Sequence, residues 1–180
     1  KNYLAGATNF LERDPNVFRY SWFIGRGAGA TVFPYIDLYA GSGQMTALGQ
    51  LYLDIPVYDS TQVFSLPGRI EAEEYYRQKG VFAELTSDTD GLLNIGYTST
   101  GDWLKYKVIV TVSGEYQVIT RYAGTAAGSF DVFIDDVKKA TYPGDNSNWQ
   151  QGMVEISAGK HTLRWQPKYH CSIDYIVISK

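Results

Sequence analysis

The strongest constraint on the fold is a series of short, alternating segments that begins at Arg69 and continues through the rest of the sequence. Each segment is rich in Val, Ile, Tyr and Thr and is separated from the next by Gly, Asn, Asp or Ser. The clearest are DWLKYKVIVTV, GEYQVITRYAG, GSFDVFIDDV, GMVEISAG, KHTLRWQP and SIDYIVISK. Regular short strands with turn residues between them predict an antiparallel β-sandwich of about 100 residues. Over residues 117–122 the alternation is imperfect, so the sequence leaves open which face of that strand joins the core.

The residues before this series follow a different pattern. A helix-like segment, ATNFLERDPNVFRY, precedes a short apolar strand, YSWFIG, and GQMTALGQLYLD then places apolar residues at helical spacing. The Gly-rich stretch between them predicts a loop, and phosphate binding there is disfavoured because neither glycine motif for phosphate is present. Two prolines and several polar residues next predict a linker. We therefore divide the chain into an N-terminal α/β part, residues 1–54, a linker, residues 55–68, and the sandwich, residues 69–180.

Charge and composition exclude several classes of function. The net charge of −3 and pI near 5.3 argue against nucleic-acid binding, which needs clustered Lys and Arg. No apolar stretch reaches the roughly 20 residues that span a membrane, and KNYLAGATNF lacks a signal-peptide core, so we expect a mature or truncated soluble piece. The single cysteine, Cys171, excludes an internal disulfide and a multi-cysteine metal site. The 15 Tyr and 4 Trp suit both sheet surfaces and faces that receive flat polar ligands.

Five motifs, in order along the sequence, carry a resemblance. They are RIEAEEYY, NIGYTSTGDWLKYKV, SGEYQVITRYA, NWQQGMVEISAGKHTLRW and SIDYIVIS. Residues 69–180 resemble carbohydrate-binding module family 6, a jelly-roll β-sandwich appended to polysaccharide hydrolases. The resemblance implies a secreted, extracellular and non-catalytic domain that holds a polysaccharide chain close to an attached enzyme.

The acids of RIEAEEYY are the candidate metal ligands. Glu71 and Glu73, at a spacing of two, share one face of a predicted strand. The family carries a structural calcium where its first and last strands meet, and the resemblance implies that Glu71, Glu73 and Asp174 supply oxygen ligands to Ca²⁺. Alternatively, both glutamates are solvated on an edge strand, where charge also prevents edge-to-edge pairing.

Aromatic residues are the candidates for stacking on a sugar, because a pyranose ring presents an apolar C–H face and a rim of hydroxyls. Tyr97 in NIGY and Trp149 in NSNWQ match the two positions that grip a sugar in the resembling family. The turn-like neighbourhood of Trp149 favours exposure. Trp103 is expected to lie in the core. If Tyr97 and Trp149 are buried as well, the domain is a structural or adhesion sandwich.

One position departs from the family pattern. An Asn often precedes the I-D-[WY] of the last strand and hydrogen-bonds a sugar hydroxyl, whereas this sequence has Ser172, with a shorter reach and one donor. Affinity or ligand choice is thereby in question. The candidate substitutes from nearby loops are Glu84, Asn94, Asn148 and His170. The pair His170 and Cys171 lacks a second ligand, and we interpret it as structural.

The N-terminal part carries a second resemblance. FLERDPNVFRYSWFIGRG followed by GQMTALGQLYLD, residues 1–54, resembles the end of a (β/α)₈ TIM-barrel glycoside hydrolase of the β-1,3-glucanase-like kind. Catalytic carboxylates of such barrels come from earlier strands, which this sequence does not contain, and Glu12 and Asp14 are predicted at a helix end. We therefore expect no catalysis by this chain. The exposed apolar faces of such a remnant are expected to pack on the sandwich or, by self-association, on a second copy.

Together these patterns favour a polysaccharide-binding module over a hydrolase or a structural sandwich. The glucanase-like N-terminal part indicates β-1,3-glucan (laminarin type) as the ligand. Xylan, cellulose and agarose remain alternatives, because loop differences decide between such chains.

Overall fold

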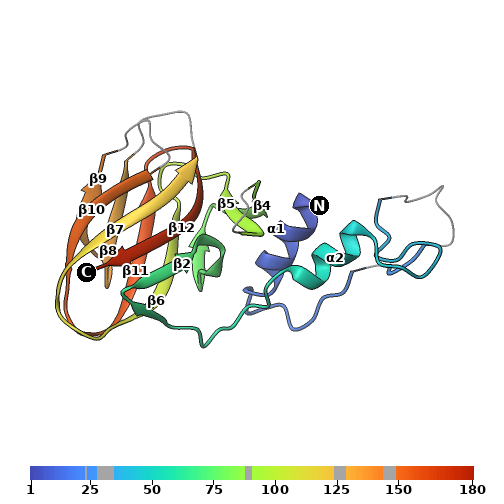
Figure 1. The fold of residues 1–180 in the computed structure, drawn as a ribbon, viewed down its shortest axis with the longest axis horizontal. Helices are drawn as coiled ribbons and strands as arrows, with labels where there is room; N and C mark the ends of the chain where they lie inside the picture. Colours follow the sequence, from blue (N-terminus) through green and yellow to red (C-terminus); the bar gives the residue numbers. More distant parts are fainter. Residues whose placement is uncertain (23, 28–34, 88–90, 124–128, 144–148) are drawn as a thin grey trace. The chain divides into compact units, whose positions relative to one another are not determined.

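The computed structural model describes the chain except for residues 23, 28–34, 88–90, 124–128 and 144–148 (Figure 1). It divides into two compact units, Lys1–Tyr58 and Asp59–Lys180. The division falls inside the range predicted as a linker. Among the described residues, no helix has both the length and the apolar character needed to cross a bilayer.

The N-terminal unit contains two helices, α1 (Asn2–Leu11) and α2 (Ala47–Asp54). Helix α1 ends before Pro15, because proline disfavours helical geometry at the residue before it, so the helix covers only the start of the segment that looked helical. Helix α2 is capped at its N-terminus by Thr46, whose Oγ1 accepts a hydrogen bond from the amide of Gly49 at 3.0 Å. Helix α2 confirms the helical spacing seen in the sequence.

The strand expected over residues 20–25 is not formed at its described positions. Trp22 instead donates from Nε1 to the carbonyl of Ile36 at 2.8 Å. A barrel strand is held by hydrogen bonds to parallel neighbours on both sides, and the described residues of this unit include no such neighbour. The described residues of this unit contain only an isolated antiparallel bridge, between Tyr39 and Met45.

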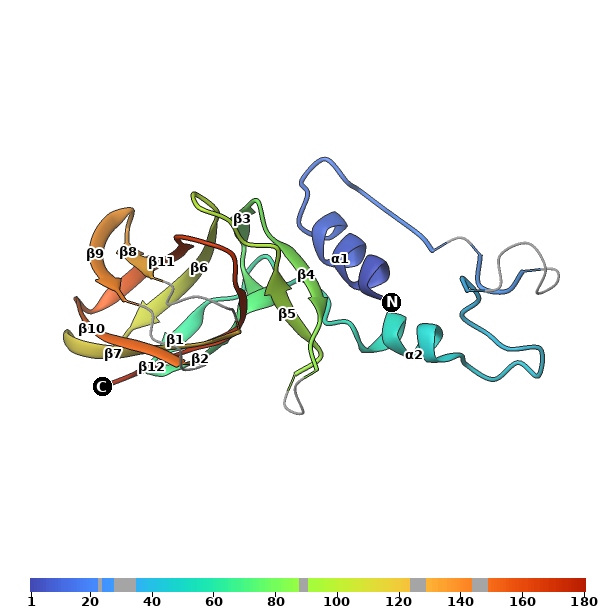
Figure 2. The same ribbon diagram turned by 90° about the horizontal axis from the view of Figure 1, so that it is seen from above.

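The second unit is a sandwich of two six-stranded sheets (Figures 1 and 2). The sheet that we name the β6 sheet has the order β1-β6-β11-β8-β9, with β3 also pairing β6. Its strands are β1 (Phe64–Leu66), β3 (Arg77–Lys79), β6 (Trp103–Val110), β8 (Phe130–Ile134), β9 (Val137–Tyr142) and β11 (Gly159–Pro167). Its neighbours pair antiparallel except β1, which runs parallel to β6.

The other sheet, named the β12 sheet, has the order β10-β7-β12-β5-β4, with β2 also pairing β12. Its strands are β2 (Gly68–Glu71), β4 (Phe82–Leu85), β5 (Leu93–Gly96), β7 (Gly114–Ala123), β10 (Trp149–Ile156) and β12 (Ser172–Ser179). A single 3₁₀ turn, η1 (Ala72–Glu74), follows β2. The predicted mainly β fold, a sandwich with a small N-terminal unit, is confirmed. Strand β1, however, lies within the range predicted as a linker.

The core lies between the sheets and follows the period-two alternation of the strands. Strand β6 buries Leu104, Tyr106, Val108 and Val110 and turns its other residues outward. Strand β7, whose face the sequence left open, places Tyr116, Val118, Thr120 and Tyr122 in the core. The odd-numbered residues of β7 therefore line the outer face of the β12 sheet. Trp103, expected in the core, is half-buried on the outer face of the β6 sheet, because Leu104 and Tyr106 occupy the inner positions.

Candidate functional site

A row of aromatic and arginine side chains crosses the outer face of the β12 sheet. The register pairs Trp149 with Arg121 and Arg121 with Tyr175, so these side chains point to the same side of three adjacent strands. Tyr175 is paired in turn with Glu71 on β2. The row therefore continues from β10 to β2 across four strands.

The rings in this row are held by one another and by guanidinium groups. The Trp149 and Tyr175 ring centroids are 5.8 Å apart in an edge-to-face arrangement. The Arg121 guanidinium carbon lies 5.7 Å from each of these two centroids, and that of Arg69 lies 3.6 Å from the Tyr175 ring. Trp149 nevertheless leaves 44% of its surface exposed. An exposed indole held in a fixed orientation is a platform for a flat ligand.

A polar pocket of about 230 Å³ lies on the same sheet beside this row. Its lining residues are Thr86, Ser87, Asn94, Arg121, Tyr122, Ala123, Ser172 and Asp174. Ser172 donates from Oγ to Oε1 of Glu84 at 3.2 Å. Because the pocket contains amide, hydroxyl, carboxylate and guanidinium groups, it offers both donors and acceptors to a ligand with many hydroxyls. We name the pocket together with Trp149 the Trp149 pocket.

The structure thus brings together most of the predicted sugar-binding residues that it describes. Asn94 and Ser172 line the pocket, and Glu84 contacts Ser172. Trp149 does not line the pocket but lies beside it, with its ring centroid 5.7 Å from the guanidinium carbon of the lining residue Arg121. Asn148 lies outside the described residues.

Tyr97 is exposed at the end of β5, with a left-handed backbone (φ 59°). Its described ring partner is Phe82, with centroids 6.3 Å apart. Tyr97 and Phe82 therefore form a second exposed aromatic pair, and no described contact joins them to Trp149. The predicted pairing of Tyr97 with Trp149 around one sugar stays a prediction.

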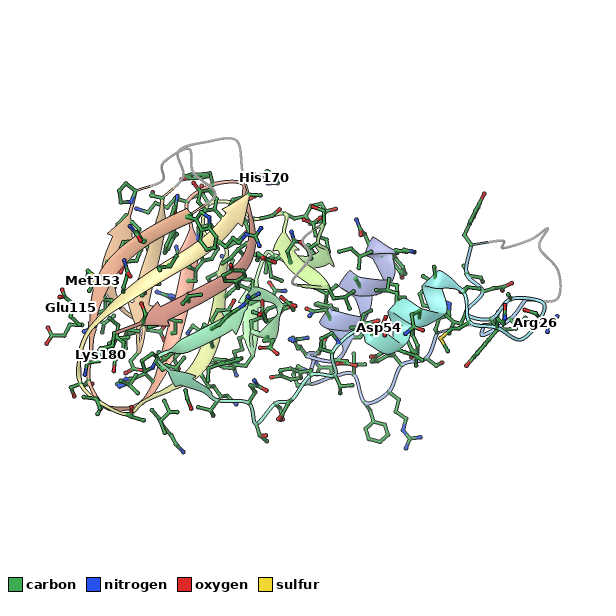
Figure 3. All side chains as sticks on the ribbon, viewed as in Figure 1. Arg26, Asp54, Glu115, Met153, His170 and Lys180 are labelled. Atoms are coloured by element: carbon green, nitrogen blue, oxygen red, sulfur yellow. The ribbon has the colours of Figure 1, made fainter. Side chains whose placement is uncertain are left out.

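The other strand-end candidates have structural partners. His170 lies at one end of the sandwich, opposite the end marked by Glu115, Met153 and Lys180 (Figure 3), and its Nδ1 is 3.1 Å from the carbonyl oxygen of Thr98. Cys171 is buried, and burial raises the pKa of its thiol, which makes the thiol a poor nucleophile near neutral pH.

The predicted calcium ligands lie at the junction of β2, η1 and β12. Glu73 is buried, and burial raises its pKa to about 8, with the neighbouring charges of Glu71, Glu74 and Asp174 acting in the same direction. A buried carboxyl among other acids is protonated at neutral pH unless a cation joins it. Carboxylate oxygens are the ligands that Ca²⁺ prefers, so the chemistry of these side chains suits that ion.

The three acids do not form a closed metal site by themselves. In the described part of the chain, no group of at least three His, Cys, Asp or Glu side chains is arranged to hold a metal ion. Glu71 forms an ion pair with Arg69 at 2.6 Å, and Asp174 forms one with Arg121 at 3.2 Å. To bind Ca²⁺ here, Glu71 would have to release Arg69 and Asp174 would have to release Arg121. Main-chain or water oxygens would have to complete the coordination.

Sequence reasoning missed Arg121, Tyr175 and Arg69. Each lies on an outward position of its strand, which alternation indicates. Their alignment into one row depends on the register of β10, β7, β12 and β2, and register joins residues far apart in the chain.

Two family models match the chain. One, described as carbohydrate binding module (family 6), matches residues 71–180, and the other, described as glycosyl hydrolase catalytic core, matches residues 1–52. No curated protein matches the chain.

Several solved structures are similar to the sandwich. One is a carbohydrate-binding module of Cellvibrio mixtus lichenase 5A in complex with cellotriose, with 29% identity and a TM-score of 0.57 over 63% of this chain and 97% of that one. Another is the C-terminal module of LamC, a marine laminarinase of Zobellia galactanivorans, with 26% identity and a TM-score of 0.55 over 63% and 98% of the two chains. A third is a module of Clostridium cellulolyticum in complex with xylose, with 26% identity and a TM-score of 0.56 over 64% and 99%.

Proposed function

Through residues 71–180 this chain belongs to the family 6 carbohydrate-binding modules, which are non-catalytic, and on that premise we propose that it binds a polysaccharide chain at the Trp149 pocket. In this proposal the module acts outside the cell and keeps an attached glycoside hydrolase close to its substrate. The match of residues 1–52 to a glycosyl hydrolase catalytic core supports the attachment.

The observation that carries the proposal is the position of an exposed indole beside a pocket of polar groups. The Trp149 ring offers an apolar face for sugar C–H groups, and Asn94, Ser172 and Arg121 offer hydrogen bonds to the hydroxyl rim. Edge contact with Tyr175 fixes the indole before a ligand arrives, which lowers the ordering cost of binding. The wholly structural alternative is less favoured, because Trp149 and Tyr97 are both exposed.

Our first choice of ligand is a β-1,3-glucan. The similar module of LamC belongs to a laminarinase, and the similar lichenase module was solved with cellotriose. The Clostridium module holds xylose, so xylan and cellulose, together with agarose, are the competing ligands.

The test is calorimetric titration of the chain, in calcium, with laminari-, cello-, xylo- and agaro-oligosaccharides. We expect saturable binding to the laminari series and its loss in Trp149→Ala, since stacking of one ring on an aromatic side chain contributes about 1–3 kcal/mol. Trp149→Phe keeps an aromatic face and should bind weakly, and Tyr3→Ala, an exposed ring of the N-terminal unit, should bind normally. Normal binding by Trp149→Ala would show that the sugar binds at another site. If none of the four oligosaccharide series bound, the proposed function would be rejected.

We further propose that a structural Ca²⁺ joins β2 and β12 through Glu71, Glu73 and Asp174. The raised pKa of Glu73 and the crowding of acids around it support a cation at this point. Calcium should raise the melting temperature of the wild type but not that of Glu73→Gln. An equal shift in both proteins, or no shift in either, would exclude this site.

The N-terminal unit exposes apolar side chains that a barrel would cover. Tyr3, Phe10, Phe18 and Leu53 are all exposed within it. We propose that they pack on a second copy of the chain, so that the chain self-associates. Sedimentation over a range of concentrations should then show a dimer, and a monomer at every concentration would contradict the proposal.

A further inference from the structure

Two arginines, Arg69 and Arg121, connect the acids at the junction of β2, η1 and β12 with the aromatic rings on the outer face of the β12 sheet. Each arginine pairs with a carboxylate and also lies against a ring. We propose that these arginines compete with a divalent cation for the same carboxylates, and that release of Arg121 from Asp174 tightens sugar binding at the Trp149 pocket. This inference rests on the proposed function of that pocket and adds a regulation of it.

Arg121 contacts both groups of residues. Its Nη1 donates to Oδ2 of Asp174 at 3.2 Å, and its guanidinium carbon lies 5.7 Å from the ring centroids of Trp149 and Tyr175. The side chains of Arg121 and Asp174 are 31% and 12% exposed, so solvent ions screen this pair only in part. Arg121 also lines the polar pocket. Because a guanidinium presents its donors in a fixed fork, pairing with Asp174 restricts which of them can face a ligand there.

Arg69 repeats this arrangement on β2. Its Nε lies 2.6 Å from Oε1 of Glu71, and its Nη2 donates to Oε2 of the same residue at 3.1 Å, which makes the pair bidentate. The guanidinium carbon lies 3.6 Å from the Tyr175 ring centroid, within the range of a cation–π contact. Two of the three acids proposed as calcium ligands therefore have an arginine as counter-ion.

The exchange of arginines for a cation is balanced in charge. One divalent cation carries the charge of two guanidinium groups, so the carboxylates of Glu71 and Asp174 keep the same compensation when it replaces Arg69 and Arg121. Carboxylate oxygens are also the ligands that Ca²⁺ prefers. The two guanidinium groups, in contrast, lose their acceptors and need new ones, because a guanidinium can only donate.

The direction of the effect follows from what the released Arg121 can contact. A sugar hydroxyl accepts hydrogen bonds, and Arg121 already lies in the pocket that is proposed to hold the sugar. The edge contact between Trp149 and Tyr175 does not involve the arginine, so the stacking face is kept. Sugar and cation should therefore favour each other's binding, and linkage requires the same factor in both directions.

The experiment measures the sugar affinity of the full chain by calorimetry, in calcium chloride and in chelator with sodium chloride of equal ionic strength. The probe is a laminari-oligosaccharide, or a cello-, xylo- or agaro-oligosaccharide if only that series binds. We expect calcium to tighten binding about fivefold, the lower end of usual coupling between two sites. Arg121→Gln should lose this calcium-dependent factor, whatever its own affinity. The control is Arg77→Gln, which removes the same charge from an exposed position of β3 on the other sheet and should keep the factor.

A second measurement needs no sugar. The exposed side chain of Arg69 can be replaced in Arg69→Gln with little risk to folding. Because this variant removes the competitor for Glu71, Ca²⁺ should bind it about threefold more tightly than the wild type, a factor typical of a partly exposed ion pair. Arg121→Gln should likewise bind Ca²⁺ more tightly, and Arg77→Gln should bind it as the wild type does.

The outcomes separate this inference from the function on which it rests. A calcium-dependent gain in sugar affinity that Arg121→Gln loses and Arg77→Gln keeps, together with tighter Ca²⁺ binding by Arg69→Gln, supports the inference. Sugar binding that calcium does not change, a gain that persists in Arg121→Gln, or unchanged Ca²⁺ affinity in Arg69→Gln would overturn it and leave the sugar-binding function in place. If no oligosaccharide bound in either solution, both the function and the inference would be rejected.

Discussion

The two outer faces of the sandwich have the same construction but different chemistry. On the β12 sheet, Trp149, Arg121 and Tyr175 alternate ring with cation, and the acid Asp174 pairs with the arginine. On the β6 sheet, Arg77, Lys105 and Arg164 follow one another, and Asp136 lies at the edge of the row. The inward residues of both sheets are mostly apolar. The comparison teaches that the inward half of each strand builds the common core, and that the outward half gives each face its own chemistry.

The largest effect on stability is expected in the core between the two sheets, on which both outer faces depend. Trp165 is buried in the core at 1% exposure and packs on Phe130, with ring centroids 5.4 Å apart. Trp165→Ala should cost about 3–5 kcal/mol in the free energy of unfolding, because it leaves a cavity between the sheets. Denaturant titration measures this cost. A loss below about 1 kcal/mol, typical of a surface substitution, would show that the sheets do not depend on one core.

The next effect is a pH dependence of stability that arises from Glu73 and not from either outer face. The unfolded chain releases the Glu73 proton near its ordinary pKa of 4.5, whereas the folded chain keeps it until about 8. Between these values the folded state holds more protons, so in chelator the free energy of unfolding should fall as pH rises, by about 3 kcal/mol between pH 4.5 and pH 7.

Thermal unfolding at several pH values measures this slope. Glu73→Gln should remove it, and calcium should flatten it in the wild type. Glu84→Gln, a carboxylate on the sugar-binding side, serves as the control. A slope that persists in Glu73→Gln would assign it to another group.

The local sequence pattern predicted which residues form strands, but it did not predict which strands pair with one another. The alternation of β6 and the turns around it define Leu104 and Tyr106 as core without knowledge of any partner strand. Strand β1 has only three residues and is ordered by a parallel partner more than forty residues away, a relation that leaves no local signal. The strand expected at residues 20–25 is not formed at its described positions for the converse reason: its pattern is apolar, but no partner strand lies among the described residues of this unit.

The candidate site shows the same limit. Trp149, Ser172 and Asn94 were identified from short motifs, and the structure places them on one face. Arg121 and Tyr175 were missed because the sequence does not distinguish them from other outward Arg and Tyr residues. Only the pairing of β7 with β10 and β12 places them beside Trp149. The burial of Glu73 could not be predicted either, since a glutamate within a turn is ordinarily solvated.

A smaller effect sharpens the chemistry of the Trp149 pocket. Ser172→Asn adds a longer side chain with two donors where the family often has Asn. It should tighten binding of a neutral oligosaccharide about fivefold, since one hydrogen bond contributes roughly 1 kcal/mol. Calorimetry with laminari-oligosaccharides measures it, and Ser87→Asn on the same pocket is the control. Equal gains in both variants would mean that added polarity, and not position, causes the effect.

The smallest effect concerns Asp136, which pairs with two cations of the β6 sheet. Asp136 is exposed at a left-handed turn position (φ 62°) and accepts from Lys105 and Arg164. Asp136→Asn keeps a residue that tolerates this backbone but frees both cations. The melting temperature should fall slightly at low salt, because Lys105 and Arg164 then repel each other without a shared acid, and the fall should shrink near 0.5 M salt, where charges are screened within about 5 Å.

The matched control is Asp54→Asn at the end of α2, which changes the net charge equally in the other unit. If Asp54→Asn gave the same loss, net charge alone would account for it. A loss confined to Asp136→Asn would show that this acid holds Lys105 and Arg164 side by side on the β6 sheet, as Asp174 pairs with Arg121 on the other face.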